Sequence, residues 1–280
     1  MSSTRVLRWS AVLASLFALS AVAAQASWHK RGHDYNRGPD RVLYATTNQN
    51  QLISFNARNP DRIRNIQAIS GLASGVTLRG IDFRPAIGDL YGVGSDSVVY
   101  RVNPRTGIAV AEGPAFTPAL SGNSFGVDFN PTVDKIRVVS DAGQNLRLNV
   151  DEGTALSQDQ NINPGMPQVV GSAYTNSSFT ATKPAATTLY AVDAASDRLF
   201  VQNPPNNGTL TMGQRLGIDV GPNAGFDIAG ADNVGFLTNA ASRRGTTIYT
   251  VDLQTRKTRS LGRVGGGKRL VLTGLAAWQD

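Results

Sequence analysis

The sequence predicts an all-β fold, a single β-propeller of five four-stranded blades, and three observations support this prediction. A motif at Gly80, GIDFRP, returns almost unchanged as GVDFNP at Gly126, and weaker copies follow. Apolar and polar residues alternate with period two over short runs separated by turn residues, as in antiparallel strands. The glycines that open the repeats lie at positions 80, 126, 171, 225 and 274. Their spacings are 46, 45, 54 and 49 residues, close to the roughly 40 to 50 residues of a propeller blade.

The best-preserved unit runs from Gly80 to Gly107 and predicts one complete blade. Its alternating runs are expected to form three strands, broken at Arg84-Pro85 and closed by the turn at 103–107, and a fourth strand is expected at Ile108 to Glu112. The unit at 126–153 matches it most closely. The unit at 171–208 carries an insertion at 175–188 and ends in a Pro- and Asn-rich turn at 203–208, where a tight hairpin connection and a binding loop are both open interpretations.

The two ends of the repeat region are expected to complete one blade together. After Gly274 the chain has room for one strand only. The segment from Leu43 to Pro60 matches the middle and end of a unit but lacks its first strand. We therefore expect Leu43–Ala45 to pair with the strand around Gly274 and to close the ring without exposed edges. A twisted double-sheet sandwich is the alternative fold, but it does not explain one period repeated five times.

The N-terminal region has the pattern of an export signal. Arg5 and Arg8 precede an apolar run, 11–23, and Ala24-Gln25-Ala26 has the small-x-small form of a signal-peptidase site. The sequence predicts a signal peptide over 1–26, a flexible polar leader over 27–42 and the propeller over 43–280, in a secreted protein of the periplasm or the extracellular space. An uncleaved anchor is the alternative, although the run is shorter than the ~20 apolar residues of a spanning helix. No transmembrane span is expected in the mature chain.

Composition excludes several kinds of chemistry. The chain has no cysteine, so disulfides, thiolate catalysis and Cys-ligated zinc are excluded. Both histidines, His29 and His33, lie in the leader, which leaves a Ser-His-Asp hydrolase without a base in the repeats. The mature chain has only two glutamates, Glu112 on a predicted outer strand and Glu152 in a turn.

Positive charge gathers in the last repeat. The formal net charge is +7, or +5 without Arg5 and Arg8. The segment from Arg243 to Arg269 contains one acidic residue, Asp252, and eight basic residues. The basic residues are Arg243, Arg244, Arg256, Lys257, Arg259, Arg263, Lys268 and Arg269. Such a patch could attract an anionic envelope polymer, or it is a solvated face. Because no aromatic residues interleave, specific nucleic-acid binding is not expected.

Four segments of the chain resemble a known family. GIDFRP, SFGVDFNPTVDKIRVVSDAGQNLRLN, QNPPNNGTL and DVGPNAGFDI are similar to the domain of unknown function 4394 family, over about Leu43 to Trp278. The resemblance implies a secreted or envelope protein of bacterial type with a propeller-like repeat fold. It implies no activity, because the name of this family carries none.

The repeats suggest one group of candidate ligand-binding residues. Asp82, Asp128 and Asp227 occupy the same position in three units, on the first strand, which lines a propeller's channel. They are predicted to bind a channel cation such as calcium or to polarise a sugar, with Asn123 and Asn223 upstream as neutral oxygen ligands. The alternative is that each Asp accepts main-chain N–H groups and fixes blade packing. Ala173 and Ala276 interrupt the series in the other two units.

The sequence thus favours a binding or interaction module of unknown ligand, without an assigned cofactor, over an enzyme. The alternative is a hydrolase or lyase acting on carbohydrate or a small ester through channel carboxylates. One further metal site is suggested at the mature N-terminus. Cleavage after Ala26 would give Ser27-Trp28-His29, whose amine, two amides and imidazole suit square-planar copper(II) or nickel(II).

Overall fold

The computed structural model describes residues 38–152, 154–240 and 245–279, and in them it forms five antiparallel four-stranded sheets. Blade 1 consists of β4 (Leu78–Phe83), β5 (Leu90–Gly94), β6 (Val99–Val102) and β7 (Ala109–Ala111). Blade 2 consists of β8 (Phe125–Asn130), β9 (Lys135–Ser140), β10 (Asn145–Asn149) and β11 (Thr154–Gln158). Blade 3 consists of β12 (Val169–Tyr174), β13 (Leu189–Asp193), β14 (Arg198–Gln202) and β15 (Leu210–Arg215).

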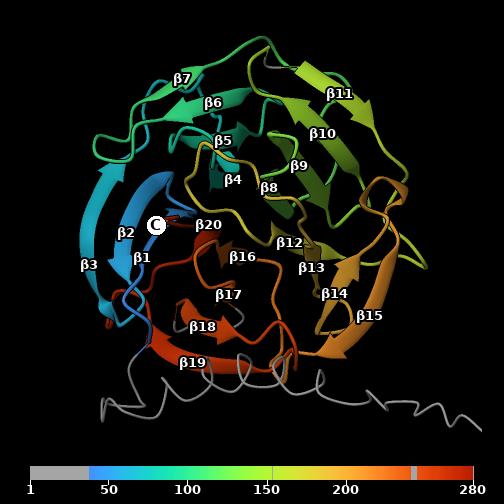
Figure 1. The fold of residues 1–280 in the computed structure, drawn as a ribbon. Helices are drawn as coiled ribbons and strands as arrows, with labels where there is room; N and C mark the ends of the chain where they lie inside the picture. The colour runs from blue at the N-terminus through green and yellow to red at the C-terminus, as the bar shows by residue number, and fades with distance from the viewer. Residues whose placement is uncertain (1–37, 153, 241–244, 280) are drawn as a thin grey trace, which may run out of the picture. The chain divides into compact units, whose positions relative to one another are not determined.

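Blade 4 consists of β16 (Ala224–Ala229), β17 (Val234–Asn239), β18 (Thr247–Val251) and β19 (Thr258–Arg263). The closing blade consists of β20 (Leu272–Ala277), β1 (Val42–Thr47), β2 (Gln51–Asn56) and β3 (Asn59–Ala68). The first strand of each unit is innermost, and these strands contact one another in the ring β4–β8–β12–β16–β20 (Figure 1). The predicted five-bladed propeller is confirmed.

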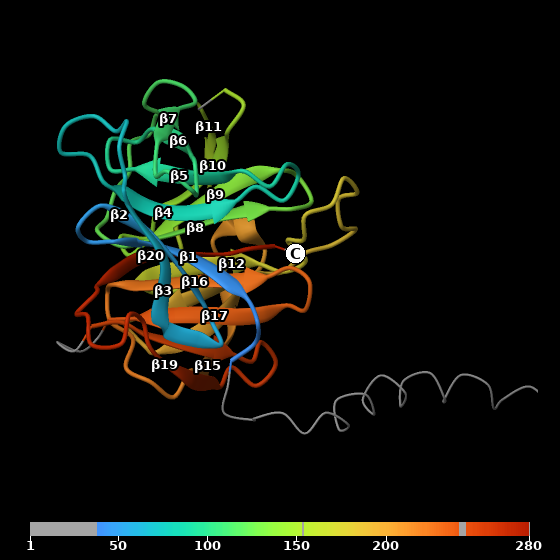
Figure 2. The same ribbon diagram turned by 90° about the vertical axis from the view of Figure 1, so that its left-hand side faces the viewer.

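The ring closes by pairing the two ends of the repeat region. β1 lies between β20 and β2, with Leu43 opposite Ala277 and Ala45 opposite Leu275. This is the predicted pairing, and it completes the closing blade with strands from both ends of the repeat region. It joins the first and the last strand of the chain in one sheet, as the blue and red strands show in Figure 2.

The hydrophobic core lies between neighbouring blades. One cluster of buried residues joins the closing blade to blade 4, another joins blades 1 and 2, and others join blades 3 and 4 and the closing blade to blade 1. Phe83, Phe129 and Phe236 are fully buried. Each sheet packs between two neighbouring sheets, so the apolar residues on both of its faces are covered, as in other propellers. No described helix is long and apolar enough to cross a membrane.

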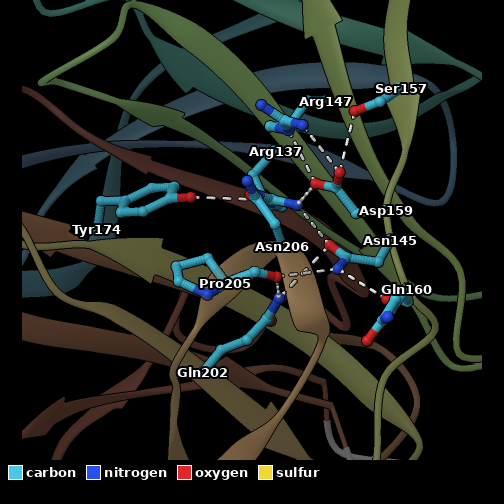
Figure 3. A network of polar contacts seen from close by, with 10 residues as sticks. All are labelled: Arg137, Asn145, Arg147, Ser157, Asp159, Gln160, Tyr174, Gln202, Pro205 and Asn206. Atoms are coloured by element: carbon cyan, nitrogen blue, oxygen red, sulfur yellow. Dashed lines mark hydrogen bonds and ion pairs between the residues drawn. The ribbon is translucent and has the colours of Figure 1, made fainter.

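Two buried arginines lie at two of these blade interfaces. Arg84 of blade 1 pairs with Asp134 (2.6 Å) and Asp151 (2.7 Å) of blade 2. Arg137 of blade 2, on the side facing blade 3, is 2% exposed and pairs with Asp159 (2.6 Å), which follows β11 of the same blade, as Figure 3 shows. A buried charge needs such partners because desolvation penalises it. Bonds from Arg147 and Arg137 outweigh the opposing effect of burial and hold the pKa of Asp159 below its usual value.

The turn at 203–208 belongs to the same interface. It contains the short 3-10 helix η2 (Pro205–Asn207). The Asn206 side chain accepts a hydrogen bond from Arg137 (2.7 Å), and the Pro205 carbonyl accepts one from Asn145 (3.0 Å) (Figure 3). These contacts favour the interpretation of this turn as a structural connection, since it packs into a blade interface.

Candidate functional site

Three aspartates meet near the axis of the propeller. Asp82 on β4, Asp128 on β8 and Asp227 on β16 each place a carboxylate oxygen within 4.8 Å of the others. Their exposed fractions are 2%, 1% and 1%. The structure therefore brings together the three predicted carboxylates, and it removes them from solvent.

Each carboxylate accepts main-chain N–H groups of the inner strands. Asp82 accepts from Phe83 (2.7 Å) and from Phe129 of the next blade (2.7 Å). Asp128 accepts from Tyr174 of the next blade (3.1 Å). Asp227 accepts from Ile228 (2.6 Å) and from Ala277 of the closing blade.

Three aspartates thus serve all five inner strands. The five donors are the residues that follow the repeat Asp, or the Ala in its place, in each unit: Phe83, Phe129, Tyr174, Ile228 and Ala277. Where Ala173 and Ala276 replace the aspartate, the Asp of the preceding inner strand accepts the donor: Asp128 accepts from Tyr174, and Asp227 accepts from Ala277. Buried N–H groups need an acceptor, each at a cost of about 1–3 kcal/mol if left unpaired. The arrangement explains why two units carry alanine.

Burial and mutual repulsion keep these carboxyls protonated to higher pH than usual. Burial, reinforced by the charge of Asp227, raises the pKa of Asp82 well above its ordinary value. Burial together with Asp82 and Asp227 does the same for the pKa of Asp128. Burial raises the pKa of Asp227 to about 6, although bonds from Ala277, Ile228 and Asp128 oppose the shift. The interaction between the two carboxyls raises the pKa of Asp128 and lowers the pKa of Asp227, so Asp128 is the one that keeps the shared proton.

This set of shifts predicts a pH-dependent stability. Unfolded aspartates titrate near ~3.9, so above about pH 4 the folded protein binds more protons than the unfolded chain, and the free energy of unfolding falls as pH rises. The contribution is fully present below about pH 4 and is lost as pH rises through the raised pKa of each carboxyl, which is about 6 for Asp227. We expect the urea midpoint to decrease from pH 5 to pH 8 at constant ionic strength. A midpoint that stays level or rises would contradict this assignment.

The five repeat glycines close the axis on one side of the carboxylates. A Cβ on Gly80 would lie 2.4 Å from a Val127 methyl, and one on Gly126 would lie 2.4 Å from the Ser172 main-chain nitrogen. Gly171, Gly225 and Gly274 have contacts of 2.8–2.9 Å at the same point. The space left among these glycines is about 10 Å³, about that of one water molecule. The inner strands approach too closely to leave an open channel.

An aromatic cluster and the 175–188 insertion close the other side. Phe83 packs edge-to-face against Tyr44 and Trp278, with ring centroids 5.2 and 5.0 Å apart. Phe179 of the insertion adds its ring 4.8 Å from Trp278. In Figure 1 the yellow insertion after β12 crosses this end of the propeller. The three carboxylates therefore lie in a sealed compartment.

In this compartment the carboxylates organise main-chain donors and are poorly placed for substrate chemistry. Five N–H groups already bond to the carboxylate oxygens that would coordinate a cation, which opposes binding of a hard cation even though carboxylate oxygens suit calcium. A hydrolase would need a carboxylic acid beside a bound sugar, and this compartment has no room for one. The geometry favours the architectural interpretation of Asp82, Asp128 and Asp227.

The two predicted asparagines lie elsewhere, on the far side of the glycines. Asn123 and Asn223 are exposed and line a cavity of about 290 Å³, where the inner strands begin. The predicted set of three carboxylates and two amides is thus divided between two places. The whole lining comes from four blades: Thr47, Asn48, Thr77, Leu78, Arg79, Asn123, Ser124, Phe125, Pro222, Asn223, Ala224 and Thr273.

The polar side chains of this cavity include several without partners. Among described residues, the Asn48, Asn123 and Asn223 amides form no hydrogen bond, and the Arg79 guanidinium forms neither a hydrogen bond nor an ion pair. Only main-chain atoms of these asparagines are engaged: Asn48 donates its N–H to Val271, Asn123 donates to Asp141, and Asn223 accepts from Ala240. The described lining of the cavity therefore presents free amides and one free guanidinium to solvent.

Arg79 and Asn48 are residues that the sequence analysis missed. Arg79 is the one charged residue that directly precedes a repeat glycine, where the other units have Phe125, Val170, Ala224 and Thr273. That departure from the repeat was a usable signal. Asn48 carried none, since it belongs to the incomplete first unit.

The predicted basic residues divide by exposure. Five of them are exposed on β19, directly before it or in the loop after it: Lys257, Arg259, Arg263, Lys268 and Arg269. The neighbouring β3 adds exposed Arg62 and Arg64. Arg256 is instead 6% exposed, and its guanidinium lies 4.9 Å from the centre of the Tyr190 ring in blade 3. Arg243 and Arg244 lie outside the described residues, as do Ser27, Trp28 and His29 of the suggested copper or nickel site.

Comparison with known proteins identifies a family. A family model described as a domain of unknown function (DUF4394) matches residues 51–276. No curated protein matches the chain.

Similar solved structures share low identity with this chain. A chain of a nidogen–laminin complex is 16% identical (TM-score 0.44), and the alignment covers 86% of this chain and 99% of that one. A protein of unknown function from Bacteroides thetaiotaomicron VPI-5482 is 10% identical (TM-score 0.48), covering 80% and 55%. A Lactobacillus plantarum protein is 16% identical (TM-score 0.42), covering 84% and 71%.

Proposed function

The chain belongs to the DUF4394 family, and from this premise we propose that its propeller is a binding module for a small polar ligand. The observation that carries the proposal is the 290 Å³ cavity with three unpartnered amides and an unpartnered arginine. Its volume is near the lower end of the roughly 300–1,000 Å³ of ligand pockets. Its polar groups come from several blades, so a ligand would contact strands that the ring holds rigidly in place.

The chemistry of the lining supports binding in preference to hydrolysis. The described lining residues offer amides, hydroxyls and a guanidinium, with no carboxylate or imidazole to act as acid or base. The carboxylates of the hydrolase alternative are the sealed ones, Asp82, Asp128 and Asp227. Together with the export pattern over residues 1–26, these features support a role in the periplasm or outside the cell.

A bulky side chain at the rim tests the cavity as the binding site. Asn123→Trp fills space at an exposed position whose side chain has no partner to lose, so the fold is expected to be retained. We expect compounds from a small-molecule set that raise the melting temperature of the wild type to lose that effect in Asn123→Trp. The control is Gln254→Trp, at an exposed turn between β18 and β19 on the opposite face. Compounds that stabilise all three proteins equally would contradict the proposal.

A further inference from the structure

Arg79 departs from the other lining residues in charge, in position and in partners. Among the described residues of the cavity lining, it is the only charged one. It is exposed, and among described residues no acidic side chain pairs with it. A free guanidinium in a concave site is a binding group for a carboxylate or phosphate, because its fork of donors matches either anion.

A β-bulge places this side chain at the cavity. β4 pairs with β5 through Leu78 opposite Gly94 and Gly80 opposite Val93, so Arg79 is the extra residue of the ladder. Bulges re-aim a side chain and are frequent beside functional sites. The same bulge occurs at Val170 in blade 3 and at Thr273 in the closing blade, whereas blade 2 pairs through Phe125 and Gly126 without a shift. The bulge is therefore shared by several units, and the charge at position 79 is what distinguishes blade 1.

A carboxylate bonded to the rim beside Asn123 is already in use. Asp141 accepts the main-chain N–H of Asn123 (2.9 Å). It thereby fixes the loop that carries an unpartnered amide. Within the described part of the lining, Arg79 is left as the uncompensated charge.

We infer that the ligand is a small organic anion, the size of one sugar residue, whose carboxylate or phosphate pairs with Arg79. Its hydroxyl groups bind the amides of Asn48, Asn123 and Asn223, since an amide side chain both donates and accepts hydrogen bonds. A hexuronate and a sugar phosphate share this chemistry. The inference rests on the proposed function and adds the charge and size of the ligand.

Calorimetric titration of the full exported chain with three sugars tests the inference. The probes are D-glucuronate, D-glucose 6-phosphate and, as the neutral counterpart, D-glucose. We expect at least one anion to bind the wild type at least about tenfold more tightly than glucose, with affinity that falls as sodium chloride increases. Preference for glucuronate would identify a carboxylate ligand, and preference for the sugar phosphate would identify a phosphate ligand.

Two arginine variants show whether Arg79 is responsible. Arg79→Gln keeps a polar side chain and removes the charge, and we expect it to weaken anion binding at least about tenfold. Arg62→Gln removes the same charge from exposed β3 on the outer rim and should bind like the wild type. Absence of anion binding, equal binding of glucose, or unchanged affinity in Arg79→Gln would overturn the inference. The proposed function would still hold if neutral compounds lose their effect in Asn123→Trp, so the two failures are distinguishable.

Discussion

Asp82→Asn is expected to lower the free energy of unfolding by about 3 kcal/mol, whereas Asp128→Asn is expected to be tolerated. Both oxygens of Asp82 accept main-chain N–H groups, from Phe83 and Phe129. An asparagine there must turn its NH2 toward one of these donors, which leaves a buried N–H unpaired at a cost of about 1–3 kcal/mol, with donor repulsion in addition.

Asp128 differs because only one of its oxygens accepts a main-chain N–H, that of Tyr174. Its protonated carboxyl donates to Asp227, and an asparagine amide reproduces both interactions. We expect Asp128→Asn to change stability by less than about 1 kcal/mol at pH 5. At pH 8 it should be more stable than the wild type, since the amide cannot lose the donor proton.

Urea unfolding of both variants at pH 5 and pH 8 measures these effects. Equal losses of stability in the two variants would show that the number of main-chain N–H groups an aspartate accepts does not set its contribution. A loss of stability in Asp128→Asn that is larger at pH 8 than at pH 5 would contradict the assignment of the shared proton to Asp128.

Gly126→Ala is expected to cost about 3 kcal/mol or more, the upper end of the range for overpacked cores. The added Cβ would lie 2.4 Å from the main-chain nitrogen of Ser172 and 2.7 Å from the carbonyl carbon of Gly171. Both atoms belong to the neighbouring inner strand β12. Relief of this clash therefore requires two blades to move apart. A clash with a flexible side chain could be relieved by rotation of that side chain alone.

Gly267→Ala is the matched control. Its Cβ would meet no atom within 4 Å, and its φ lies outside the left-handed region. We expect its melting temperature to stay within a degree or two of the wild type, because surface substitutions away from such contacts usually change stability by less than about 0.5 kcal/mol. A similar loss in both variants would mean that the glycines matter for chain entropy and not for the closure of the axis.

Most of the fold was predictable because it depends on local pattern. The spacing of Gly80, Gly126 and the later glycines gave the blade length, and the missing first strand before Leu43 gave the closure. The sequence analysis placed the Arg256 side chain wrongly on a surface. Its aromatic partner, Tyr190, belongs to another blade and lies far away in sequence.

The site was less predictable because it depends on distances between blades. Alternation placed Asp82 on the inner side of its strand, but it could not show that the glycines leave about 10 Å³ beside it. Nor could it show that Phe179, from an insertion more than 90 residues later in the sequence, covers the other side. The cavity is formed by loops of four blades, and its lining has no common motif.

The closing blade determines on which face of the propeller the chain enters the ring and leaves it. β1 runs toward the cavity and ends there at Thr47, so the chain enters the ring at Val42 on the opposite face. β20 begins beside the cavity and ends at Ala277, opposite Leu43. The residues before Val42 and after Ala277 therefore join the propeller at one point. A tether attached there would leave the cavity facing away from whatever anchors the protein, open to ligands arriving from the other side.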